Sequence, residues 1–299
     1  MSGSSTKAIM MAFIANSGIA IAKTAGALHT GSGSMMAEAI HSFADCINQV
    51  LLFVGIKRSE KKPDAKHPMG YARESYFWSM IVAMMLFFLG GAFAIYEGAH
   101  RLMHPGSLES PEIGLAILAF GVLLEGWSLR GAIQATKEKR GDKSLWQWFK
   151  DTHQSELMVI VGEDFAAIAG LSLAFVMLGL SMWTGDLMYD ALGSILIGVL
   201  LVVVSFFVAR EIHSLTVGEA AVEVRDNVKT HLDSLTFIDE VFDIIATHHG
   251  SEVMVAIKAK PESNMNSDVL IELINQAEND IKKNNPTVKW LFFEVDNIA

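Results

Sequence analysis

The chain has 299 residues, of which 51% are hydrophobic and 19% charged, and its formal net charge at pH 7 is −10. This composition is too apolar for an ordinary soluble domain and indicates a membrane protein. The single cysteine, Cys46, excludes an intrachain disulfide.

Six hydrophobic runs fill most of the first 210 residues. Each has about the 20 residues that a helix needs to cross the hydrocarbon core of a bilayer. The first run is too long for a cleavable signal peptide and lacks a small-residue cleavage site, so we interpret it as a helix of the mature protein. The predicted spans are roughly 8–30, 35–56, 75–98, 113–135, 157–182 and 189–209.

The charges of the connections predict the orientation of these spans. The connection 57–74 holds six Lys and Arg residues and the connection 136–151 holds five, whereas the three opposite connections hold only Arg101. Because positively charged loops stay in the cytoplasm, we expect six crossings with both termini cytoplasmic. No transit peptide precedes the first span, so a bacterial inner (plasma) membrane is the expected location of this multi-pass protein.

The tail after the sixth run has a different character. Residues 215–299 hold 15 acidic and 7 basic residues, which argues against nucleic acid or anionic lipid as a partner. The expected fold class is therefore membrane all-α, with a six-helix transmembrane domain at 1–214, followed by a small cytoplasmic α+β (α-β-β-α-β) domain at 215–299. Its predicted elements are a helix at 219–235, strands at 238–246 and 252–260, a helix at 266–284 and a strand at 288–295.

Two ionisable residues in the second run suggest a metal site. His41 and Asp45 are four residues apart and lie on one helix face, about 40° apart. An ionisable residue inside a bilayer is costly and is a functional candidate by default. An imidazole and a carboxylate so placed can ligate one divalent ion, and the alternative is a buried pair that bonds to itself or to a neighbouring helix.

Further charged residues lie in the other runs. Asp164, in the fifth run, adds a second acidic helix to the candidate site. Glu163 projects about 100° away from Asp164, so it either reaches sideways as a ligand or proton carrier, or pairs elsewhere, with Arg130 or Lys23. Glu125 is either a proton carrier or a structural acid that bonds to an adjacent helix.

A second constellation lies in the basic connection between the second and third runs. Asp64, His67 and Tyr71 are spaced i, i+3 and i+7. An Asp and a His can hold a metal, but Tyr is a poor ligand, and Pro68 and Gly70 indicate a turn in which a histidine can simply be exposed.

Several stretches, taken together, resemble the cation diffusion facilitator family. They are "SGSMMAEAIHSFADCINQ", "HPMGYARESY", "YEGAHRLMHP" and "YDALGSILIGVLLV", and "GED" with "LEG" resembles the branch that contains the mitochondrial zinc transporter. The resemblance implies export of divalent metals, mostly zinc, in exchange for protons, by a homodimer with a cytoplasmic terminal domain.

The resemblance assigns residues position by position. His41, Asp45 and Asp164 match transport ligands, but Ile160 stands where the family has its fourth ligand, a histidine. Water, Glu163 or Asn16 of the first helix would then complete the site. Secondary metal positions correspond to Asp64 and His67 in the loop, and to Glu294 and Asp296 in the tail, where most family ligands are missing and metal sensing is expected to be weak or absent.

The function expected from these residues is divalent metal efflux by metal/proton antiport, with zinc first and iron(II) or manganese as alternatives. The proton-coupling candidates are His41, Asp45, Glu125 and Glu163, because ligands must lose protons to bind metal. The metal is expected as transported substrate, without a catalytic cofactor. A membrane metalloenzyme or a metal sensor is the competing interpretation, although no H-E-x-x-H motif is present.

Overall fold

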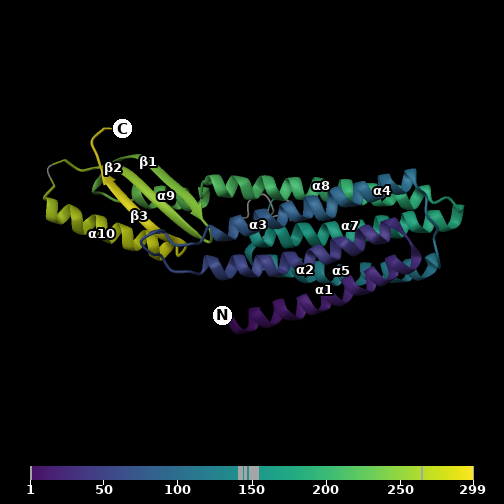
Figure 1. Cartoon of the computed structure of the whole chain (residues 1–299). Coiled ribbons are helices and arrows are strands. Elements are labelled where there is room, and N and C mark those ends of the chain that lie inside the picture. Colours follow the sequence, from purple (N-terminus) through teal and green to yellow (C-terminus); the bar gives the residue numbers. More distant parts are fainter. Residues whose placement is uncertain (1, 141–143, 145–146, 148–154, 264, 299) are drawn as a thin grey trace. The chain divides into compact units, whose positions relative to one another are not determined.

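The computed structural model describes residues 2–140, 144, 147, 155–263 and 265–298. The chain forms two compact units, shown in Figure 1. The first contains residues 1–57 and 75–213, and the second contains residues 58–74 and 214–299. The connection 58–74 therefore groups with the C-terminal residues.

The first unit is a bundle of long helices (Figure 1). Each predicted apolar run lies within one helix or one continuous helical stretch, and most helices extend several residues beyond the run. The third run is a single stretch made of α3, a π-helical segment η1 and α4. The elements are α1 (Ser2–Thr30), α2 (Gly33–Ser59), α3 (Glu74–Met85), η1 (Leu86–Ala92), α4 (Phe93–Met103), α5 (Pro111–Arg140), α7 (Ser155–Thr184) and α8 (Met188–Val217).

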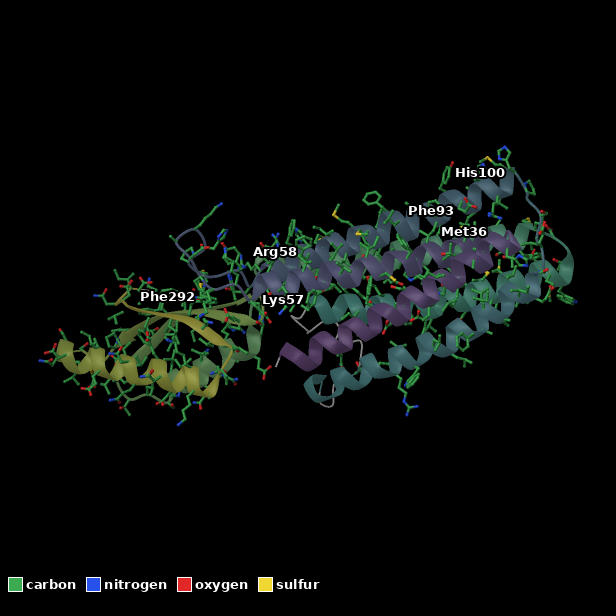
Figure 2. All side chains as sticks on the ribbon, turned by 60° about the horizontal axis from the view of Figure 1, so that its bottom comes forward. Met36, Lys57, Arg58, Phe93, His100 and Phe292 are labelled. Carbon is green, nitrogen blue, oxygen red and sulfur yellow. The ribbon has the colours of Figure 1, made fainter. Side chains whose placement is uncertain are left out.

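Among the described residues, four helical stretches are long and apolar enough to cross a membrane. They are 33–59, 74–103, 159–184 and 188–217. Figure 2 shows Met36 of α2 and His100 of α4 towards one end of the helical unit, and Lys57 of α2 at the other. The stretch 33–59 and the stretch 74–103 therefore run in opposite directions.

Glycines allow the stretch of η1 and α4 to pack closely against α8. A Cβ on Gly198 would lie 2.7 Å from the Gly91 carbonyl oxygen, and a Cβ on Gly91 would lie 3.2 Å from the Gly198 carbonyl oxygen. A side chain at either position would push the two helices apart. Small residues take this role in membrane bundles, where helix association depends on close packing rather than on the hydrophobic effect.

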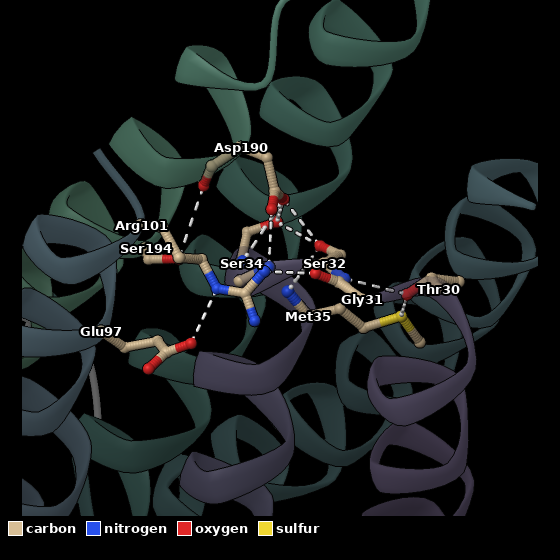
Figure 3. A network of polar contacts seen from close by, with 10 residues as sticks. Thr30, Gly31, Ser32, Ser34, Met35, Glu97, Arg101, Asp190 and Ser194 are labelled. Carbon is tan, nitrogen blue, oxygen red and sulfur yellow. Dashed lines mark hydrogen bonds and ion pairs between the residues drawn. The ribbon is translucent and has the colours of Figure 1, made fainter. Parts of the chain in front are cut away.

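The start of α2 is bound to the first turn of α8 (Figure 3). Asp190 is only 3% exposed and accepts hydrogen bonds from Ser32 Oγ and Gly33 N, both at 2.6 Å, and from Ser34 N at 3.3 Å and Ser34 Oγ. The carboxylate thus satisfies N–H groups that a helix start leaves without partners, and its charge complements the positive end of the helix dipole.

Arg101, near the end of α4, contacts the same turn (Figure 3). Its Nε donates to Glu97 Oε1 at 2.7 Å, and its guanidinium donates to the carbonyl oxygen of Gly31. The turn between α1 and α2 is therefore fixed from both α4 and α8, which sets the position of α2 in the bundle.

The second unit is a small α+β domain with the predicted order α-β-β-α-β. β1 pairs antiparallel with β2, and β2 pairs parallel with β3. Inward-facing residues of β2 alternate with outward-facing ones and pack with α9 and α10, which is expected when one face of a sheet is covered. The elements are α9 (Val222–Asp233), β1 (Ile238–His249), β2 (Glu252–Pro261), α10 (Ser267–Asn284) and β3 (Val288–Val295).

The turn between β1 and β2 contacts the connection 58–74. Gly250 has φ +67°, a left-handed conformation that favours glycine. A Cβ at this position would also meet the carbonyl oxygen of Ala72. Glycine is therefore required here both by the backbone conformation and by the close approach of the connection.

Candidate metal site

The candidate site begins with His41 and Asp45 on α2. His41 is fully buried, and its Nδ1 lies 3.6 Å from Asp45 Oδ1. Within the described part of the chain, both ring nitrogens of His41 and Oδ1 of Asp45 are buried and have no hydrogen-bond partner. Buried polar atoms without partners are rare in native structures and indicate strain, a catalytic role or a ligand.

The distance between these two atoms suits a shared metal ion. It is longer than a hydrogen bond, which joins such atoms at about 2.9 Å. Two ligand atoms that lie about 2.1 Å from an ion at a tetrahedral angle are about 3.4 Å apart. The pair therefore offers two first ligands to a divalent ion with little movement of either side chain.

Two other predicted acids, Glu125 and Glu163, interact electrostatically with this pair. Glu125 of α5, which is 9% exposed, interacts with both His41 and Asp45. Glu163 of α7, which is 7% exposed, interacts with Asp45 and with its neighbour Asp164. In this conformation no three His, Cys, Asp or Glu residues of the described part are close enough to hold one ion.

Glu163 has a partner that the sequence did not indicate. Asn48 of α2 donates from Nδ2 to Glu163 Oε1 at 2.6 Å, so neither Arg130 nor Lys23 is the residue that holds this oxygen. Asn48 lies one turn beyond Asp45 on the same helix, and the bond links α2 to α7 beside the candidate site.

Asn16 lies on the part of α1 that faces α2. The next residue, Ser17, donates to Cys46 Sγ at 3.7 Å, and Cys46 directly follows Asp45. The Asn16 side chain is half-buried. α1 therefore runs close to the candidate site at this level, as the suggestion of Asn16 as a ligand requires.

Sequence reasoning missed three polar residues of α2 beside the site, and the partner of Lys23. The Lys23 ammonium donates to Glu38 and Ser42, and not to Glu163. A count of polar residues at helical spacing would have found the stripe on α2, since positions i, i+4 and i+7 share a face. The missed residues are Glu38, Ser42, Asn48 and the contact of Lys23.

The loop pair Asp64 and His67 is held by protein donors. Asp64 Oδ2 accepts hydrogen bonds from Tyr71 Oη at 2.7 Å and Lys61 Nζ at 3.2 Å, and its Oδ1 accepts from the His67 backbone N at 2.8 Å. The Tyr71 hydroxyl, followed by the His67 amide, holds the pKa of Asp64 well below its usual range. The carboxylate therefore shapes the loop through its own neighbours.

Replacing Asp64 and His67 together by alanine is expected to change metal flux by less than about threefold, since Asp64 already has protein partners and a surface ion pair contributes little. Metal flux in proteoliposomes measures the effect, with Lys66→Ala as a matched loop control. A collapse of flux in the double variant alone would make this loop an entry or coupling site.

Of the two tail positions, Glu294 is exposed and Asp296 is paired with a lysine. Lys258 Nζ lies 3.0 Å from Asp296 Oδ2 and holds the pKa of Asp296 below its usual range. Glu294, which is exposed, lies opposite Lys258 in the parallel register of β2 and β3. The ammonium of Lys258 thus already pairs with one of these two acids, Asp296.

Comparisons with known proteins place the helical unit in a family. The family profile described as the cation efflux transmembrane domain matches residues 9–215, more than half of the chain. Similar proteins include the proton-coupled zinc antiporter SLC30A9, mitochondrial, of Xenopus laevis (38% identical over 60% of this chain and 33% of that protein) and of Homo sapiens (36%, over 67% and 36%). Metal tolerance protein C4 of Arabidopsis thaliana is 34% identical over 64% of this chain and 42% of its own length.

The chain therefore spans about a third to two fifths of the length of these relatives. The matched region contains α2 and α7, which carry the His41–Asp45 pair and Asp164. The chain belongs to the cation diffusion facilitator family of membrane transporters, as the cation efflux domain over residues 9–215 establishes.

Proposed function

We propose that this protein exports a divalent metal ion, zinc, in exchange for protons. The observation that carries the proposal is the buried His41–Asp45 pair, whose facing ligand atoms are 3.6 Å apart and have no hydrogen-bond partner in the described part of the chain. The relatives named as proton-coupled zinc antiporters support both the ion and the exchange. With Asp164, the site has one imidazole and two carboxylates.

Iron(II) or manganese is the second candidate substrate. Zinc sites commonly contain several nitrogen or sulfur ligands, whereas carboxylate-rich sites suit harder ions. This site has Ile160 in place of a second histidine, and the acids Glu125 and Glu163 lie nearby. A competition flux assay with zinc, iron(II), manganese and cobalt ranks the ions directly.

The proposed architecture has six crossings, with α1 and α5 added to the four stretches that meet the length and hydropathy requirement. The basic connections 57–74 and 136–151 support cytoplasmic termini. In this proposal residues 1–214 transport the ion, and residues 215–299 hold two copies of the chain together as a homodimer.

Protonation of the ligands provides the exchange. Asp45, Asp164 and His41 bind the ion only when deprotonated, so protons arriving from the opposite side neutralise the two carboxylates, give the imidazole a positive charge and release the ion. The interactions of Glu125 with Asp45 and of Glu163 with Asp45 support these two acids as proton acceptors next to the ligands. Asn48 favours this role for Glu163 over that of fourth ligand, because it already binds Oε1.

Transport by the purified full chain in liposomes tests the proposal. We expect zinc flux that is driven by a pH gradient and accompanied by proton movement in the opposite direction, read from zinc and pH dyes in the same vesicles. A metal sensor would bind zinc without flux, and a metalloenzyme would need neither flux nor a gradient. If the protein binds zinc but shows no zinc flux driven by the pH gradient, the proposal is overturned.

A further inference from the structure

A buried ion pair lies one turn from His41 along α2. Lys23 Nζ of α1 donates to Glu38 Oε2 at 3.2 Å and to Ser42 Oγ at 2.7 Å. The side chains of Lys23 and Glu38 are 1% and 0% exposed. Charges inside a membrane protein are costly unless they are paired, so each of these residues depends on the other.

The three acceptors on this side of α2 follow one helix face. Glu38, Ser42 and Asp45 have i, i+4 and i+7 spacing, which places them in a row along the helix. Lys23 is bonded to the first two members of the row and interacts electrostatically with the third. The Lys23 side chain has a flexible four-carbon stem, so the acceptor that binds its ammonium decides which carboxylate of the row it approaches.

Two neighbouring helices close over this ion pair. A Cβ on Gly170 of α7 would overlap Oε1 of Glu38, and a Cβ on Gly121 of α5 would lie 3.7 Å from Cε of Lys23. The ion pair is therefore enclosed by α1, α2, α5 and α7. The carboxylate of Glu38 therefore lies between Gly170 of α7 and the Lys23 ammonium of α1.

We propose that Glu38 is a positioning residue of the transport site: it holds the Lys23 ammonium one turn away from Asp45, so that this carboxylate stays available for the transported ion. The inference rests on the proposed function, since it assigns Asp45 to the ion. Lys23 is then an internal competitor for Asp45, and Glu38 and Ser42 form the clamp that restrains it. Without this clamp, the ammonium turns to the next carboxylate of the row.

Paired substitutions separate this role from a purely structural one. Glu38→Gln is expected to lower the zinc affinity of the purified full chain at least about tenfold, because the ammonium then bonds to Asp45. Adding Lys23→Met to Glu38→Gln removes the competitor and is expected to restore the affinity to within about threefold of wild type. Competition with a fluorescent zinc chelator in lipid nanodiscs measures the affinity, and thermal unfolding monitors the fold.

Two further variants complete the test. Ser42→Ala removes one contact of the clamp without changing charge, so it keeps the fold and is expected to lower zinc affinity about threefold, again restored by Lys23→Met. Glu97→Gln is the matched control. It removes the carboxylate that pairs with Arg101 within α4, a helix that carries no proposed ligand, and should leave zinc affinity unchanged.

Each remaining outcome decides against the inference. Wild-type affinity in both Glu38→Gln and Ser42→Ala would show that the clamp does not protect Asp45. A double variant no better than Glu38→Gln would show that the ion pair serves packing alone. In both cases a wild-type protein that binds zinc leaves the proposed function standing, whereas a wild-type protein that binds no zinc overturns both.

Discussion

Replacing His41, Asp45 or Asp164 by alanine is expected to abolish metal transport while the protein still inserts into the membrane. Each variant removes one of the three proposed ligands. Even the replacement of a residue that only orients a metal ligand typically lowers metal affinity or activity by about 10- to 100-fold. A direct ligand should cost at least about 100-fold in zinc flux. Flux in proteoliposomes, normalised to the amount of inserted protein, is the measurement.

Ser172→Ala is a suitable control for Asp164→Ala. Ser172 is exposed on the same helix and donates only to the carbonyl oxygen of Ile168 within α7. Its replacement should leave flux within about twofold of wild type, as for surface substitutions in general. Wild-type flux in any of the three ligand variants would remove that residue from the transport site.

The largest loss of stability is expected from Asp190→Ala. The carboxylate accepts hydrogen bonds from four groups at the start of α2, namely Ser32 Oγ, Gly33 N, Ser34 N and Ser34 Oγ. Alanine removes the acceptor of the backbone N–H groups of Gly33 and Ser34, whereas the Ser32 and Ser34 hydroxyls are 3.1 Å apart and can bond to each other. Each buried N–H group left unsatisfied costs about 1–3 kcal/mol. A total destabilisation of about 3 kcal/mol or more is therefore expected, measured as the free energy of unfolding in detergent.

Asp186→Ala provides the comparison. Asp186 precedes α8 in an exposed turn, and its carboxylate accepts a hydrogen bond from Met188 N at 2.9 Å. Its loss should cost about 1 kcal/mol, the typical value for a helix cap. Equal unfolding free energies for Asp190→Ala and Asp186→Ala would show that the buried carboxylate does not anchor α2.

The pattern of apolar and polar residues along the sequence was sufficient to predict the helices and strands, and to predict that His41 and Asp45 lie side by side. Both depend on spacing along one chain segment, four residues in the case of this pair. The helices extend beyond the apolar runs because their ends continue past the hydrocarbon core as polar turns. The C-terminal strands were placed to within a few residues, because alternation and turn residues mark their ends.

Contacts between distant helices could not be predicted in the same way. Asn48 and Glu163 are 115 residues apart, and nothing in either helix alone indicates which face meets the other. The partner of Lys23 depends on the rotation of α1 against α2, which the sequence leaves open. The cap of α2 by Asp190 joins residues more than 150 positions apart, and the family resemblance pointed to this stretch without giving its contact.

The π-helical segment η1 sets the rotational phase of the third membrane stretch. A π turn contains an additional residue compared with an α turn, so α4 continues α3 with its faces rotated. Deleting one residue from 86–92 would restore the α-helical pitch and leave the faces of α4 nearly unchanged, because the wide π turn absorbs that residue. Deleting one residue from 93–100, where the helix is regular, would instead turn the following residues by about 100° and shift them by about 1.5 Å, so that Arg101 would point away from the Gly31 carbonyl oxygen that it contacts. Residues before and after this segment therefore follow two separate helical registers, and a substitution pattern that runs straight through 74–103 would assign Glu97 and Arg101 to the wrong face.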